Sequence, residues 1–168
     1  GGAASINIGE SIVCDYDSGD SRYDIFLLKD RKYNYNGLAK LADAINRQGA
    51  VATIELQHPG AASRRNGKNQ MAPSDGPNPL DPSIMCRAMT EEEIYRVIDE
   101  FSEAALYAKT RGFGMVQIHG GHGWLINQIF SPFFNKRTDC WGGSVENRAR
   151  FGVAVVDEIH RKCGKDFP

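Results

Sequence analysis

Three apolar segments that are typical of buried strands alternate along the chain with three amphipathic segments that are typical of helices. The strand segments comprise residues 3–8, 50–56 and 114–119, and a long loop follows each of them. The turns that lead back from helix to strand are short. In parallel α/β folds, the loops after the strands lie at the carboxyl ends of the sheet, where active sites form. This asymmetry favours a partial (β/α)8 TIM barrel of about three consecutive βα units over a small doubly wound sheet.

The helix segments have recognisable ends and apolar faces. The first covers residues 37–49 and ends at a glycine in the C-cap position. Thr90 and Glu93 form a capping box at the start of the second, in which each side chain bonds to the backbone amide of the other residue. Ser144 is the N-cap of the third. The apolar positions at helical spacing are Leu38, Leu41, Ala42 and Ile45, then Ile94, Val97, Ile98, Phe101, Ala105 and Ala108, then Phe151, Val155 and Ile159.

Two long loops follow the second and third strand segments. The loop at residues 57–89 contains five prolines and no periodicity, so we interpret it as a lid or a binding loop. Its cations Arg64, Arg65 and Lys68 could meet an anionic ligand, but solvated loop charge is the simpler interpretation. Four charged residues near the second loop are expected to brace that loop against the last helix. They are Arg137, Asp139, Glu146 and Arg148.

Composition excludes several classes of function. The 168 residues are 41% hydrophobic and 24% charged, which suits one globular domain. With 20 basic and 21 acidic side chains, the chain has no basic field for nucleic acid and no charged block for a membrane surface. The four cysteines are scattered, which argues against a zinc or iron–sulfur site here and indicates the reduced thiols of a cytoplasmic protein. The start has no signal-peptide core. Because it lacks Met and the sequence ends at Asp166-Phe167-Pro168, we expect a chain cut from a longer one.

Alternation along the strands separates a face that packs on helices from a face that lines the barrel. The lining face carries Glu55 in the second strand segment, and Gln117 and His119 in the third. Buried polar groups are costly unless they are hydrogen-bonded, so a bound polar ligand would suit this face. The helix-facing set of the second segment is Ala52, Ile54 and Leu56.

His119 and His122 flank two glycines at the end of the third strand segment. The glycines let the backbone turn sharply and leave space beside the imidazoles. Two imidazoles at this spacing can donate hydrogen bonds to one oxygen or bind a metal together. They can equally be ordinary hydrogen-bonded loop histidines, and the spacing alone does not decide between these readings.

The surrounding sequence resembles a known family. The motifs that carry the resemblance are His119-Gly-Gly-His-Gly-Trp-Leu-Ile-Asn-Gln-Ile-Phe-Ser-Pro132, Asn135-Lys-Arg-Thr-Asp139, Trp141-Gly-Gly-Ser-Val-Glu-Asn-Arg148 and Glu55-Leu-Gln-His-Pro-Gly60. They resemble the Old Yellow Enzyme family of FMN-dependent ene-reductases, and more closely its NADH:flavin oxidoreductase and enoate reductase branch. The resemblance covers nearly the whole chain.

The resemblance implies a cofactor, a reductant and a substrate class. FMN would pass hydride from NADH or NADPH to an α,β-unsaturated carbonyl compound, and His119 and His122 match the pair that grips the carbonyl oxygen. Gly9 falls where the family packs backbone against the flavin. Glu55 stands where many members have a Gln that bonds the flavin pyrimidine edge. A carboxylate can accept from the flavin N3–H there but cannot donate to a carbonyl.

Trp124 departs from the family pattern. It occupies the position where many members have a Tyr that protonates the substrate α-carbon. An indole N–H donates a hydrogen bond but is no practical acid, so we expect Trp124 to be an aromatic wall of the pocket. The proton would then come from water or another side chain, or the physiological reaction would differ from simple alkene reduction.

The chain supplies only part of such a barrel, which leaves three hypotheses. The first is a fragment of a single FMN-binding domain, which is compatible with a homo-oligomer. A longer parent chain would carry a 4Fe–4S cluster and FAD only if it resembled those members of this branch that have them. The second is an incomplete barrel that acts only as an assembly module. The third is a metal-dependent hydrolase that uses His119 and His122 with Glu55 or His58. The substrate itself, whether enoate, cyclic enone or steroid ketone, stays open.

Overall fold

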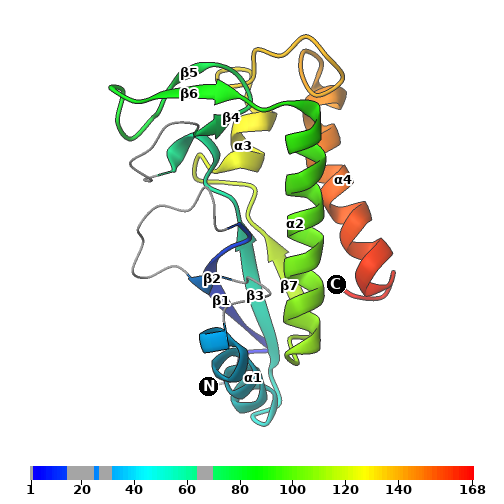
Figure 1. Cartoon of the computed structure of the whole chain (residues 1–168). Coiled ribbons are helices and arrows are strands. Elements are labelled where there is room, and N and C mark those ends of the chain that lie inside the picture. The colour runs from blue at the N-terminus through cyan, green and yellow to red at the C-terminus, as the bar shows by residue number, and fades with distance from the viewer. Residues whose placement is uncertain (1, 15–24, 27–31, 64–69) are drawn as a thin grey trace.

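The computed structural model describes residues 2–14, 25–26, 32–63 and 70–168, and four parallel strands form its main sheet (Figure 1). The strands lie in the order β2-β1-β3-β7. Their bounds are β1 (Ser5–Ile12), β2 (Ile25–Phe26), β3 (Val51–Gln57) and β7 (Met115–Ile118). The long helices are α1 (Lys32–Asn46), α2 (Glu91–Thr110) and α4 (Val145–Cys163).

Each long helix follows a strand of the main sheet. The pairs β1–α1, β3–α2 and β7–α4 are three successive βα units, with β2 as an additional short strand. Helix α1 packs on β3, and α2 packs on β3, β7 and α4. Figure 1 shows α2 and α4 side by side along one side of the sheet. Within the described residues the sheet stays open, so the predicted partial barrel is confirmed.

The hydrophobic core lies between the sheet and these helices. Ala52, Ile54 and Leu56 are fully buried on the helix-facing side of β3, as the alternation predicts. Phe101 of α2 and Phe151 of α4 are equally buried and belong to the same cluster. Truncation of a fully buried phenylalanine to alanine costs about 3–5 kcal/mol, so either position is essential to the stability of the fold.

Strand β1 and helix α1 have bounds that differ from the prediction. Strand β1 was expected to span residues 3–8, but it continues through Gly9 to Ile12. Its pairing with β3 shifts between Ile8 and Ser11, so two residues of β1 lie opposite Glu55 alone. This arrangement is a β-bulge, and a glycine inside a strand often marks one.

Helix α1 begins before the predicted residue 37 and ends at Asn46 rather than at Gly49. The Asn46 side chain accepts a hydrogen bond from the backbone N–H of Ala52 at 3.0 Å and donates to the carbonyl of Gly112 at 2.9 Å. It thereby joins the start of β3 to the turn before β7. Gly49 has a φ of 81° and supplies the left-handed residue of the turn that follows.

The predicted caps of the other two helices are confirmed. The Thr90 hydroxyl accepts from the backbone of Glu93 at 3.2 Å, and the Glu93 carboxylate accepts from the backbone of Thr90 at 2.9 Å. At α4, the Ser144 hydroxyl accepts from the backbone of Asn147 at 3.2 Å. These bonds satisfy amides that have no partner inside the helix.

Both long loops contain structure that the prediction lacked. The loop after β3 holds a short 3-10 helix and a small sheet, and the loop after β7 holds the short helix α3. Strands of two to four residues are too short to show periodicity, which is why sequence patterns miss them. The bounds are η1 (Gly60–Ala62), β4 (Met71–Ala72), β5 (Gly76–Pro77), β6 (Met85–Ala88) and α3 (Leu125–Phe130).

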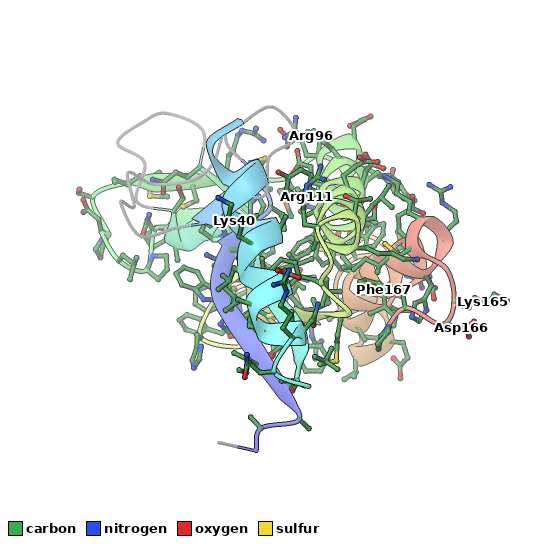
Figure 2. All side chains as sticks on the ribbon, turned by 90° about the horizontal axis from the view of Figure 1, so that it is seen from below. Lys40, Arg96, Arg111, Lys165, Asp166 and Phe167 are labelled. Atoms are coloured by element: carbon green, nitrogen blue, oxygen red, sulfur yellow. The ribbon has the colours of Figure 1, made fainter. Side chains whose placement is uncertain are left out.

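Polar contacts join the middle of α2 to the C-terminal end of α4. The Lys162 ammonium bonds the carboxylates of Asp99 and Glu103, each at 2.6 Å. Phe167, after α4, is buried and belongs to the core cluster (Figure 2). Its ring centroid lies 5.4 Å from the Lys109 ammonium. In the described residues, no helix is both long enough and apolar enough to span a membrane.

Candidate active site

Glu55 and Gln117 lie directly opposite each other on β3 and β7. The amide Nε2 of Gln117 donates to the Glu55 carboxylate at 3.1 Å. Gln117 is exposed and Glu55 is half-buried, because both lie on the face of the sheet away from the helices. The sequence-based assignment of these two residues to one face is confirmed.

Gly9 lies beside Glu55 in the neighbouring strand. A Cβ atom built on Gly9 would stand 3.1 Å from Glu55 Oε1, which is closer than most real Cβ contacts. The missing side chain therefore lets the Glu55 carboxylate lie close against the backbone of β1. The same face holds a further polar atom near this point, since Gln57 Oε1 is buried and has no hydrogen-bond partner among the described residues. The Glu55–Gln117 pair and the unpartnered Gln57 Oε1 together suit a polar ligand on this face.

His119 and His122 interact directly. The backbone N–H of His119 continues the ladder by donating to Leu56 at 2.9 Å, and its ring Nδ1 accepts from the backbone N–H of Gly121 at 3.2 Å. The Nε2 of His119 lies 3.0 Å from the Nδ1 of His122. In a neutral His119, the Gly121 contact leaves the ring proton on Nε2, which donates to His122 Nδ1. A neutral His122 then carries its own proton on Nε2, available to a ligand.

His122 is held in an unusual backbone conformation. Its φ is 55°, the only positive value at a non-glycine residue in the described part of the chain. Such a conformation costs about 1–2 kcal/mol for a residue with a side chain. The turn is closed by the Trp124 N–H on the Gly121 carbonyl at 3.1 Å and by the Gly123 N–H on Asn127 Oδ1 at 3.1 Å. Strain of this kind is common at ligand-binding positions.

Trp124 is the N-cap residue of α3 and lies next to the histidines. Its ring centroid is 6.5 Å from that of His119, with the two planes at 80°. This edge-to-face contact is favourable for aromatic rings and fixes one wall beside the imidazole pair. The three residues that sequence motifs placed together at this strand end, His119, His122 and Trp124, are thus in contact.

Gln128 is a site residue that the sequence analysis missed. It is fully buried, and its amide oxygen accepts from the backbone of Ala61 at 2.9 Å. Its amide nitrogen donates to Pro59 at 3.0 Å and to Gly123 at 2.6 Å. The side chain therefore ties the loop after β3 to the loop that carries His122. A glutamine on the apolar side of a helix would have signalled this role. That signal could be read only if α3 had been recognised in the sequence.

His58 and Gly60, in the loop after β3, form the buried surroundings of Gln128. The Nδ1 of His58 accepts from the backbone of Gly60 at 3.0 Å. Burial, aided by the Arg96 charge, lowers the pKa of His58 to about 3, so this imidazole is neutral near pH 7. Gly60 has a φ of 56°, and a Cβ there would stand 2.4 Å from Gln128 Oε1. Only glycine fits this contact.

Arg137, Asp139 and Arg148, three of the four charged residues predicted to brace the second loop, make bracing contacts. Arg137 donates to the carbonyls of Pro73 and Met89 at 3.1 and 2.7 Å, which fastens the small sheet to this loop. It also pairs with Asp139, and these hydrogen bonds hold the pKa of Asp139 below its ordinary value. Arg148 bonds the carbonyl of Phe130 at 2.8 Å. A shallow cleft of about 490 Å³ lies between the small sheet and this loop.

Two predictions concern residues or ligands outside this arrangement. Arg64, Arg65 and Lys68 lie outside the described residues. Among those described, no group of three or more His, Cys, Asp or Glu side chains could hold a metal ion. His122 Nδ1 already contacts His119, and His58 is closed inside the loop core. The geometry therefore gives no support to the metal-dependent hydrolase.

The family model that describes the NADH:flavin oxidoreductase / NADH oxidase family matches residues 3–167. The chain therefore belongs to this family of oxidoreductases. It is 48% identical over 103 residues to cinnamate reductase of Clostridium sporogenes, which covers 61% of this chain and 16% of that protein.

Solved structures of relatives have the same architecture. Histamine dehydrogenase from Rhizobium sp. 4-9 matches 99% of this chain with a TM-score of 0.90 and 29% identity, over 26% of that enzyme. Old Yellow Enzyme from Pichia sp. AKU4542 matches 96% with a TM-score of 0.83 and 26% identity, over 44% of that chain. The chain thus spans less than half the length of each of these relatives.

Proposed function

We propose that this chain forms part of the flavin and substrate site of an FMN-dependent ene-reductase that uses NADH or NADPH. The observation that carries the proposal is the contact of His119 with His122 at the carboxyl end of β7, two residues beyond Gln117. Gln117, a polar group for a flavin edge, and His119, a hydrogen-bond donor for a substrate oxygen, therefore follow one another along β7 and its end.

The residues present fit the cofactor. Glu55 offers a carboxylate acceptor, and Gly9 lets that carboxylate lie close against the backbone of β1. Bound FMN would supply hydride to the β-carbon of the substrate. Reduction of this kind builds negative charge on the substrate carbonyl oxygen, and donors already in place stabilise that charge.

The histidines supply these donors. As they are arranged, His122 offers its Nε2 proton, while the His119 Nε2 proton is used on His122. A carbonyl oxygen that replaces His122 Nδ1 as the acceptor would receive both protons. This exchange requires the His122 ring to move, which its position on an exposed turn permits.

Trp124 fits the wall of the pocket rather than the proton donor. Its indole N–H donates only, so the proton for the substrate α-carbon must come from water or from another part of the protein. Cinnamate is an α,β-unsaturated carboxylate, so the identity to cinnamate reductase supports an enoate or enone as the substrate class.

The test is NADH- and NADPH-dependent reduction of a panel of enoates and enones by the complete gene product purified with FMN. His119→Ala and His122→Ala should each lower kcat/KM about 100-fold or more, as loss of an oxyanion donor does. His160→Ala, which changes a histidine on α4 away from the site, serves as the matched control. Full activity in both active-site variants would contradict the proposal.

A further inference from the structure

We infer that Glu55 and Gln117 act as one recognition unit for the pyrimidine edge of a flavin, with Gln117 providing the N–H donor that Glu55 lacks. This inference rests on the proposed function, because it concerns how the proposed cofactor would be held. It assigns a specific role to Gln117, a residue on β7 that strand alternation had placed only on the face lining the barrel.

The pairing of the two side chains is the first observation. Glu55 and Gln117 are direct partners in the β3–β7 ladder, and Gln117 Nε2 donates to Glu55 Oε2 at 3.1 Å. This single contact uses one of the two amide protons of Gln117. The second proton and the amide oxygen remain for a ligand.

The chemistry of the edge supplies the second argument. The pyrimidine edge of a flavin presents an N–H between two carbonyl oxygens, so it needs one acceptor flanked by donors. Glu55 is acceptor-only when ionised, whereas a primary amide both donates and accepts. The two side chains together therefore present the acceptor and the donor that neither a lone carboxylate nor the bare strand provides.

The surroundings of the pair supply the third argument. Gln117 is exposed and Glu55 is half-buried, so a strip of surface lies open over the pair. Gly9, where a Cβ would lie 3.1 Å from Glu55 Oε1, lets the carboxylate lie close against β1. A ligand laid over this strip would remove water from the carboxylate, which is costly without a hydrogen bond in exchange. The Gln117 amide already makes that bond and would keep making it beneath the ligand.

The experiment is a double-mutant cycle on FMN affinity in the complete gene product, measured by flavin fluorescence titration of the apoprotein. Gln117→Ala should weaken FMN binding about tenfold, the loss expected for one hydrogen bond to a charged or buried partner. In the Glu55→Gln background, the new amide can donate by itself. Gln117→Ala should then weaken binding less than twofold.

Two further measurements separate a donor role from a purely structural one. The thermal midpoint of the apoprotein should differ little between Gln117→Ala and Gln48→Ala, a matched change of an exposed glutamine in the turn after α1. N3-methyl-FMN, which lacks the N–H that Glu55 would accept, should bind the wild type about tenfold more weakly than FMN. Glu55→Ala should lose this discrimination.

The outcomes distinguish the two proposals. An unchanged FMN affinity in Gln117→Ala, or an equal loss in both backgrounds, overturns the paired unit and leaves the proposed function in place. A wild-type protein that binds no FMN overturns both. The paired unit is supported if Gln117→Ala weakens FMN binding only when residue 55 is Glu, and if the thermal midpoint of the apoprotein is unchanged.

Discussion

The Nδ1 of His122 lies 3.0 Å from the Nε2 of His119, and the Gly121 N–H occupies the remaining ring nitrogen of His119. The backbone therefore sets the tautomer of the first ring, and the first ring sets that of the second. With both rings neutral, this arrangement leaves the His122 Nε2–H as the donor available to a substrate.

This relationship predicts that both neutral imidazoles carry their proton on Nε2. Two-bond ¹H–¹⁵N correlation spectra of the folded protein should show the Nε2–H pattern for His119 and His122. His160→Gln removes one of the four histidine signals and so helps to assign the rest. An Nδ1–H pattern at His119 would show that the Gly121 contact does not form.

Gly60 is predicted to be irreplaceable for the loop core. Gly60→Ala would place a methyl group 2.4 Å from Gln128 Oε1 on a backbone with a φ of 56°. Strain and the loss of a buried hydrogen bond should together lower the free energy of unfolding by about 3 kcal/mol. Urea denaturation measures this change. Gly76→Ala, which meets open space, should change the free energy of unfolding by less than about 0.5 kcal/mol.

His58 is predicted to make the stability depend on pH. Its folded-state pKa of about 3 lies below the 6.5 of an unfolded histidine, so between these values the unfolded chain binds one more proton. Stability from this group is complete above about pH 6.5 and falls by up to about 1.4 kcal/mol for each unit below it.

The measurement is the free energy of unfolding at pH 7 and pH 5 for the wild type, His58→Gln and His160→Gln. The wild type and His160→Gln should lose about 2 kcal/mol more than His58→Gln between the two values. Equal losses in all three proteins would mean that the His58 ring takes up a proton in the folded state.

The isolated 168-residue chain is predicted to bind FMN weakly or not at all and to self-associate. Its sheet is open, and Ile118 and Val116 of β7 are only half-buried. Exposed strand edges and apolar faces promote association. Flavin titration and size-exclusion chromatography, alone and with a complementary barrel fragment, check this. Tight one-to-one FMN binding by a monomer would refute it, and recovery of binding on mixing would favour the assembly module.

The sequence predicted the features that depend on short-range patterns. Alternation placed Glu55 and Gln117 on one face, and capping chemistry located the starts of α2 and α4. These features depend on a few neighbouring residues whose physical preferences are strong. Resemblance to a family then gathered His119, His122 and Trp124 into one site, which the ring contacts bear out as a spatial arrangement.

The features that sequence reasoning missed depend on contacts between distant segments. Gln128 is held by backbone groups of the loop after β3. One of them is the N–H of Ala61, which lies 67 positions away in the sequence. The bulge at Gly9 exists only because β3 has one residue where β1 has two. No local pattern records either constraint, since each is a property of two segments brought together by the fold.

The three hydrogen bonds of Gln128 have a consequence for how such enzymes diversify. The residue that fills the gap left by Gly60 is encoded 68 positions downstream of it, in a different βα unit. A recombination event with its crossover between Gly60 and Gln128 would inherit the gap from one parent and its occupant from the other. The loops that carry His58 and His122 must therefore be exchanged together, or the hybrid will lose the support beneath its imidazole pair.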